Sequence, residues 1–238
     1  MKLTINKNVI LGMHQLSSRD SSRNVLCNTV NLEISGKQCV VVATDGRRLG
    51  ACSSGIVEAP DQCDPVSLTF EVPVKMLKAF PDQTIVIQFD PASPKKITIT
   101  GKTAASRRNS LAIDLLEGNF PKWRQVIPEK FTPGLSGAWF NWRLLEGFVK
   151  AAEIICGTTS TFNSPGIHVS QEDSLSPIVI HIDRLDFIGV LMPMRKDGQS
   201  NIPIPEWAKI PASPTVAAET VASSPSPSTP PNLSAQLS

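Results

Sequence analysis

The sequence predicts an α+β fold in which one small unit, a strand followed by a helix and three further strands, occurs three times. Apolar residues alternate with a period of two, then fall at helical spacing, then alternate again, and this order recurs along the chain. The units begin roughly 65 residues apart, and such internal repetition is the first thing to weigh in a fold assignment. The hydrophobic content of 41% is typical of a folded globular protein.

The first unit contains the clearest local signals. Leu3 and Ile5 alternate with polar residues and predict a short strand, and apolar spacing predicts an amphipathic helix over 7–18. Three strands are then expected at Val25–Ile34, Gln38–Thr44 and Arg47–Ser53. Asp45-Gly46 lies between the last two and predicts a tight hairpin turn, with the Asp45 side chain bonded to its own backbone.

The other two units repeat this order. In the second unit, Pro73 precedes a short helix at Val74–Phe80, a position where its missing N–H costs nothing. Its strands are expected at Val66–Val72, Thr84–Phe89, Lys96–Thr100 and Ser110–Leu115. The third unit is expected to have a helix at 142–156 and strands at Ala138–Asn141, Ile167–Val169, Ile178–Ile182 and Phe187–Pro193.

The composition changes after the third unit. We expect a connector at 201–210 and a disordered tail at 211–238, which is rich in Pro, Ser, Thr and Ala and has one charged residue, Glu219.

Several classes of function find no support in the sequence. The three histidines stand on separate elements, and the five cysteines are odd in number with no Cys-x-x-Cys pair, so we expect no metal, no cofactor and reduced thiols. No phosphate-binding or nucleophile motif is present, and we assign no catalytic residue. No apolar run approaches the ~20 residues of a membrane span, and the N-terminus lacks a signal-peptide core, which favours a cytoplasmic protein.

Three segments resemble the bacterial sliding clamp family, the beta subunit of DNA polymerase III. Ala43-Thr44-Asp45-Gly46-Arg47-Arg48-Leu49 is similar to the signature of the clamp's middle domain. Glu117–Pro128 resembles the segment that closes that domain, and Val190–Arg195 resembles the family's C-terminal strand. The matches occur in the family's order and cover roughly residues 1–196.

The resemblance implies a DNA clamp fold, with antiparallel sheets outside and helices inside. It implies a complete middle-type domain at 1–128 and a partial C-terminal-type domain at 129–200, with no counterpart of the family's N-terminal domain. Its members are non-catalytic subunits of a DNA-directed DNA polymerase complex and act as processivity factors. Expected partners are double-stranded DNA, bound without sequence preference, DNA polymerase and other clamp-motif proteins, and a clamp loader. A ring would require a homo-oligomer.

The family also has an apolar cleft that receives short peptide segments of partner proteins. Carried over by motif, the cleft would be formed by Leu26, Thr44, Gly46, Arg47, Arg48, Leu49, Pro121, Gln125, Val126, Asn141, Leu144, Val190, Met192, Pro193, Met194 and Arg195. Arg48 and Arg195 would hold carboxylates or carbonyls of the peptide at the rim. Without the resemblance, Met192 and Met194 would equally fit the core face of a strand.

Duplex DNA would meet positive charge from the helical region of every unit. These residues are Lys7, Arg19, Arg23, Lys75, Lys78, Arg143 and Lys150, with Arg107 and Arg108 as further loop candidates. The same charges would also suit the solvent-facing sides of amphipathic helices, and the net charge of +2 does not decide between the two.

Two functions therefore remain open. The chain is either a clamp that tethers replication proteins to DNA, or a truncated clamp-like module that binds those proteins without encircling DNA. The sequence ends Gln236-Leu237-Ser238, which resembles the start of a clamp-binding peptide, and the tail is a candidate ligand of the cleft.

Overall fold

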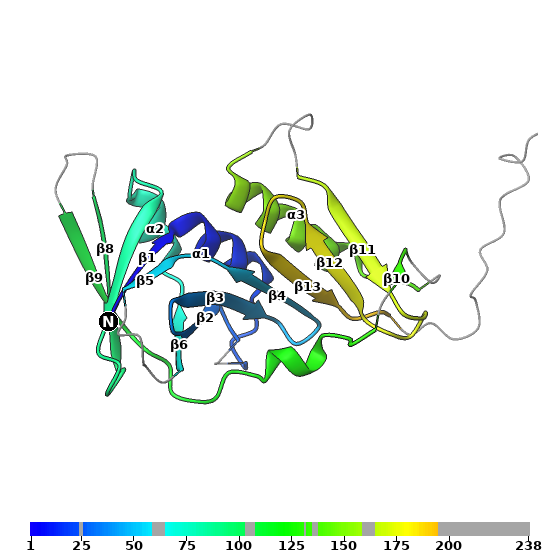
Figure 1. Cartoon of the computed structure of the whole chain (residues 1–238), viewed down its shortest axis with the longest axis horizontal. Helices are drawn as coiled ribbons and strands as arrows, with labels where there is room; N and C mark the ends of the chain where they lie inside the picture. The colour runs from blue at the N-terminus through cyan, green and yellow to red at the C-terminus, as the bar shows by residue number, and fades with distance from the viewer. Residues whose placement is uncertain are drawn as a thin grey trace, which may run out of the picture. The chain divides into compact units, whose positions relative to one another are not determined.

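Two antiparallel sheets hold the three repeated units (Figure 1). The computed structural model describes residues 1–23, 26–58, 65–102, 108–130, 132–134, 138–158 and 165–194. In this part of the chain, five strands form one sheet in the order β5-β1-β7-β8-β9. Eight strands form the other in the order β10-β11-β12-β13-β4-β3-β2-β6.

The observed elements follow the repeated order. The first unit comprises β1 (Lys2–Asn6), α1 (Lys7–Met13), η1 (His14–Leu16), β2 (Thr29–Ser35), β3 (Gln38–Thr44), β4 (Arg48–Ser53) and the added β5 (Ile56–Glu58). The second comprises β6 (Val66–Glu71), α2 (Val74–Ala79), β7 (Thr84–Phe89), β8 (Lys96–Lys102) and β9 (Arg108–Asp114). After η2 (Trp123–Val126) and β10 (Thr132–Pro133), the third comprises α3 (Trp142–Cys156), β11 (Ile167–Gln171), β12 (Ile178–Ile182) and β13 (Phe187–Leu191).

The first two units complete each other by exchanging their first strands. β1 lies in a different sheet from β2, β3 and β4 of its own unit and pairs with β7 of the second unit, with Leu3 opposite Ile87. β6 does the reverse and pairs with β2, with Leu68 opposite Leu32. Since each sheet contains strands of both units, neither unit forms its sheet without the other.

The third unit joins the first through a shared sheet and a helix pair. β13 pairs with β4 in antiparallel register, and on the helix side α3 packs against α1. Gly12 permits the close approach of the helices, because a Cβ there would lie 2.5 Å from Ile155 Cγ1 and 2.9 Å from the Ala151 carbonyl oxygen. Burial of apolar side chains from all three units in one core stabilises the assembly.

The structure corrects four predicted elements. Residues 138–141 do not form a strand; Trp139 makes a single bridge to Met194, whose N–H donates to the Trp139 carbonyl. The first helix ends its α-helical part at Met13 and finishes as a 3₁₀ turn, and β2 begins only at Thr29. β13 ends at Leu191, so Met192 and Pro193 lie beyond it.

The domain boundaries predicted from the resemblance stay predictions. Residues 1–201 cluster as one compact unit. The predicted connector and tail lie outside the described residues, as do Cys63, Arg107 and Arg195. Within the described part, no helix is both long enough and apolar enough to cross a bilayer.

Candidate functional site

The segment between β3 and β4 is a hairpin turn, as predicted, with its loop at residues 45–47 rather than at Asp45-Gly46 alone, and hydrogen bonds within the loop fix it. The Asp45 carboxylate accepts hydrogen bonds from the backbone N–H groups of Arg47 and Arg48, at 2.8 and 2.9 Å. The buried Thr44 hydroxyl donates to the Arg48 carbonyl and accepts from the N–H of Gly46, which has a φ of +86°. A side chain at Gly46 would be strained at this φ, so the residue type follows from the turn.

The Arg48 side chain connects three parts of the chain by hydrogen bonds. Its Nε donates to Asp45 Oδ2 at 3.0 Å, while Nη1 donates to the Leu144 carbonyl and Nη2 to the Gln15 carbonyl. Its side chain is only 12% exposed, and α3 leaves room for it at Gly147, where any side chain would overlap the guanidinium. Burial lowers the pKa of Arg48, and the Asp45 carboxylate opposes that shift. These bonds fix the turn, α3 and η1 relative to one another, and the expectation that Arg48 also holds a bound peptide at the rim stays a prediction.

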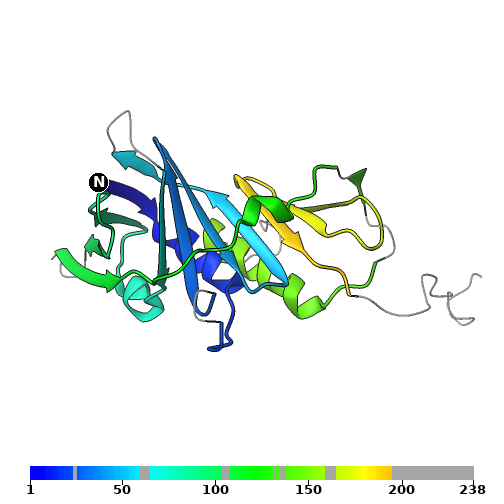
Figure 2. The ribbon, with the colours of Figure 1, turned by 90° about the horizontal axis from the view of Figure 1, so that it is seen from below.

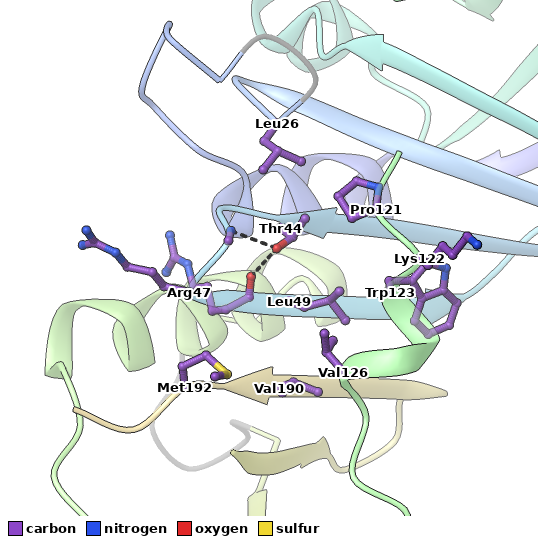
Figure 3. Close-up of a pocket in the computed structure, with 12 residues that line it drawn as sticks. Leu26, Thr44, Arg47, Leu49, Pro121, Lys122, Trp123, Val126, Val190 and Met192 are labelled. Atoms are coloured by element: carbon purple, nitrogen blue, oxygen red, sulfur yellow. Dashed lines mark hydrogen bonds between the residues drawn. The ribbon is translucent and has the colours of Figure 1, made fainter. Parts of the chain in front are cut away.

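An apolar pocket of about 150 Å³ opens beside this turn, where β4 lies next to β13 (Figure 3). Leu49 and Val190 are buried at its floor, whereas Val126 and Met192 are each 47% exposed. Ten of the residues predicted for the cleft line it: Leu26, Thr44, Gly46, Arg47, Arg48, Leu49, Pro121, Val126, Val190 and Met192.

One wall of the pocket comes from the segment after β9, which crosses the eight-stranded sheet (green in Figure 2). Trp123 anchors it: the indole Nε1–H donates to Glu33 Oε2 of β2 at 2.8 Å. Arg124 lies over the indole ring, 4.2 Å from its centroid, and its Nη1 donates to Glu33 Oε1. Trp123 is 8% exposed, so a buried aromatic side chain with a hydrogen-bonded indole N–H fixes this wall to β2.

Lys122 and Trp123 line the pocket although neither was predicted from the sequence. A signal was available, because Trp123 is a large aromatic residue two positions after Pro121, but the direction of its side chain depends on Glu33, roughly 90 residues away in the chain.

Five residues expected in the cleft are placed elsewhere. Gln125 is exposed outside the pocket, and Pro193 and Met194 follow Met192 away from its lining, with Met194 45% exposed. The Asn141 side chain caps α3 by accepting from the N–H of Arg143. Leu144 lines a neighbouring hollow.

This neighbouring hollow, of about 230 Å³, is polar and shares Arg47 and Arg48 with the apolar pocket. Arg19 and Arg23 also line it; Arg19 donates to Nε2 of His14, and Arg23 donates to the Asp45 carbonyl. Burial, followed by the charge of Arg19, lowers the pKa of His14 to about 4. A ligand in the apolar pocket would thus have exposed guanidinium groups close to one end.

Of the cationic residues expected to face DNA, the structure buries one and exposes the other six. Lys7 is corrected: it is buried, its ammonium donates to the Phe80 carbonyl, and burial lowers its pKa. Arg19, Arg23, Lys75, Lys78, Arg143 and Lys150 are exposed. Of these, Lys150 is paired with Glu146 at 2.7 Å, and Arg143 stacks near the Trp142 ring.

Within the described residues, no three His, Cys, Asp or Glu side chains are grouped so as to hold a metal ion. Cys39 and Cys52 are buried, and burial raises the pKa of each thiol to about 12, so both remain protonated near neutral pH. The apolar pocket and the hollow beside it present apolar side chains and exposed guanidinium groups.

Solved structures provide the relation to known proteins. No family model matches the chain, and no curated protein matches its sequence. The DNA polymerase sliding clamp of Pseudomonas aeruginosa, solved with a ligand, superimposes with a TM-score of 0.60 at 16% identity, over 82% of this chain and 66% of that one. The Bacillus subtilis sliding clamp gives 0.58 at 14% identity (82% and 64%), and the Thermotoga maritima DNA polymerase III beta subunit gives 0.54 at 15% identity (82% and 66%).

The chain thus spans slightly less than two thirds of the length of these proteins. At this identity the likeness is one of fold. Over 82% of its length, the chain has the fold of the bacterial DNA polymerase III beta subunit, the sliding clamp, in a form of divergent sequence.

Proposed function

We propose that the chain is a non-catalytic, sliding-clamp-like processivity factor that binds short segments of polymerases and repair proteins in the apolar pocket. The clamp fold supports this, but the observation that carries it is the pocket itself. Val126 and Met192 are about half exposed at its mouth, above a floor of buried Leu49 and Val190. Apolar side chains left open in this way are stabilised when a ligand covers them.

The pocket also indicates the chemistry of the ligand. Its lining accepts one or two apolar side chains, and the flexible Met192 side chain can adapt to different ones. Arg47 is exposed at the edge that the pocket shares with the neighbouring polar hollow, where it can meet a carbonyl or carboxylate of an extended peptide. A peptide with apolar residues next to an acidic or polar one fits this arrangement.

Peptide binding tests the proposal. A fluorescein-labelled Gln-Leu-Ser-Leu-Phe peptide should bind the full chain, and Gln-Ala-Ser-Ala-Ala should bind at least 30-fold more weakly. Met192→Ala removes about three buried heavy atoms from the complex, worth roughly 1.5–2 kcal/mol, and should weaken binding about 10- to 30-fold.

Met76→Ala is the matched control, since Met76 lies on α2 and is 46% exposed, close to the 47% of Met192. Equal losses in the two variants, or no binding of the Gln-Leu-Ser-Leu-Phe peptide, would show that the pocket is not the binding site.

The DNA-tethering part of the proposal requires a closed assembly around the duplex. Exposed Arg19, Arg23, Lys75 and Lys78 would supply phosphate contacts without reading bases. Holding a polymerase on the template raises its effective concentration there, which is how a tether increases processivity. With a clamp loader present where closure needs one, the protein should stay on nicked circular DNA through a high-salt wash and leave once the circle is cut.

A second candidate function uses the same apolar pocket without a ring. In this alternative the chain is a clamp-like module that binds replication proteins without encircling DNA. This module would bind the peptide with the same dependence on Met192. It would show no difference in retention between circular and linear DNA, which separates the two functions.

A further inference from the structure

Helix α3 has one side whose apolar residues are not covered by the described part of the chain. The side toward α1 carries Ala151 and Ile155, which meet Gly12. The side toward the sheet carries Phe148, whose ring packs edge-on against Phe187 of β13. Trp142 lies two and a half turns before Ala151 and therefore on the side opposite α1.

Trp142 and Val149 form a stripe on this outer side, because residues seven apart lie above one another on a helix. Trp142 is 67% exposed and Val149 is 40% exposed, and half-buried Leu145 lies beside them. Large aromatic side chains exposed next to other apolar residues are typical of protein interfaces.

In the first two units, the helix and the strand that follows it each have a neighbour from the other unit. Their helices lie side by side, so that α1 is placed between α2 and α3 (Figure 1). The first strand after each helix is covered by a strand of the complementary unit, β2 by β6 over six residue pairs and β7 by β1 over five. In the third unit that strand is β11, and β10 pairs only with its end, at Ser170 and Gln171.

The charges along this side of α3 are complementary to a second, antiparallel copy of the same helix. Arg143, Glu146, Lys150 and Glu153 alternate in sign and are spaced by three, four and three residues. In an antiparallel pair centred on Phe148, Arg143 meets Glu153 of the other helix and Glu146 meets Lys150, and the two-fold axis repeats both contacts. No position then brings like charges together.

We infer that the Trp142–Val149 side of α3 is an interface with a second copy of this chain, in which the two α3 helices pack antiparallel about a two-fold axis. The contact brings two third units together, much as the first and second units meet within one chain. It does not involve the apolar pocket, so it can hold or fail independently of the proposed peptide binding.

Sedimentation equilibrium of the full chain between 1 and 100 μM, together with light scattering on a sizing column, tests the inference. The parent should be a dimer in the upper part of this range. Trp142→Glu and Val149→Glu should each raise the dimer dissociation constant about 100-fold, because both bury a charge in the contact.

Charge variants give a second, independent readout. Glu146→Lys should raise the dissociation constant about tenfold, because it opposes Lys150 of the partner twice. The double variant Glu146→Lys with Lys150→Glu restores the opposite pairs between the two helices and should return the constant to within threefold of the parent. Leu175→Glu, at a turn residue that is 74% exposed, is the control and should leave the dimer intact.

Circular dichroism and thermal melts identify any variant that fails to fold. A parent that remains a monomer throughout the range would overturn the inference, and so would an oligomer that Trp142→Glu leaves intact. Trp142→Glu that weakens retention on duplex DNA without changing the mass would assign this side chain to DNA and overturn it as well.

Discussion

Replacing Arg48 by Met should destabilise the protein far more than replacing its neighbour Arg47 by Met. Both arginines belong to the same turn and both changes remove one positive charge. They differ in their surroundings, because the Arg47 side chain is exposed while that of Arg48 is 12% exposed and bonded to three partners.

The magnitude follows from the groups that Arg48→Met leaves behind. The Leu144 and Gln15 carbonyls each lose a donor, and Asp45 keeps only its two backbone N–H bonds. Breaking a buried pair with further hydrogen bonds costs about 3–5 kcal/mol. In a unit of this size, that lowers the Tm by roughly 6–20 °C. Arg47→Met should stay within about 0.5 kcal/mol of the parent.

Urea denaturation followed by Trp fluorescence and circular dichroism measures both variants under the same conditions. Equal urea midpoints for Arg48→Met and Arg47→Met would refute the conclusion that the hydrogen bonds of Arg48 stabilise the fold. Arg48→Lys should fall between them, since an ammonium reaches only part of the same set of acceptors.

Two further predictions concern stability. Gly12→Ala should gain up to about 1 kcal/mol of helix propensity, but the added methyl group meets Ile155 and the rigid Ala151 carbonyl oxygen, so we expect a net loss of about 1–2 kcal/mol in urea denaturation; equal or higher stability would contradict the α1–α3 packing. For His14, a pKa of about 4 in the folded protein against about 6.5 when unfolded means that the neutral form is favoured by folding. Stability should be full above pH 6.5 and fall by about 3 kcal/mol as the pH drops toward 4, and His14→Gln should flatten this part of the profile; a parent whose stability is constant between pH 6.5 and 4 would contradict it.

Local patterns in the sequence were sufficient for most elements. The α3 bounds and the Asp45 turn follow from apolar spacing and turn chemistry, which depend only on neighbouring residues. The exchange of β1 and β6 between units could not be predicted in this way, because hydrophobic alternation gives the face of a strand but not its partner. For the same reason residues 138–141 have strand-like alternation but make only one bridge.

Residue type was sufficient to predict apolar residues that line the pocket, but it could not predict which way the charged side chains point. Leu49, Val190 and Met192 were expected at the cleft and line the pocket. Arg47 and Arg48 are indistinguishable in sequence, and only packing against α3 separates the exposed arginine from the buried one. Lysine side chains are mostly exposed in folded proteins, yet Lys7 is buried and its ammonium donates to the Phe80 carbonyl.

The five methionines provide the most direct test that the apolar pocket is the peptide-binding site. In a protein labelled with ¹³C at the methionine methyl groups, we would titrate the Gln-Leu-Ser-Leu-Phe peptide and follow each resonance. We expect a saturable shift of the Met192 methyl resonance, with the methyl resonances of Met76 on α2 and of the buried Met13 unchanged. Saturable peptide binding that leaves Met192 unshifted would contradict it.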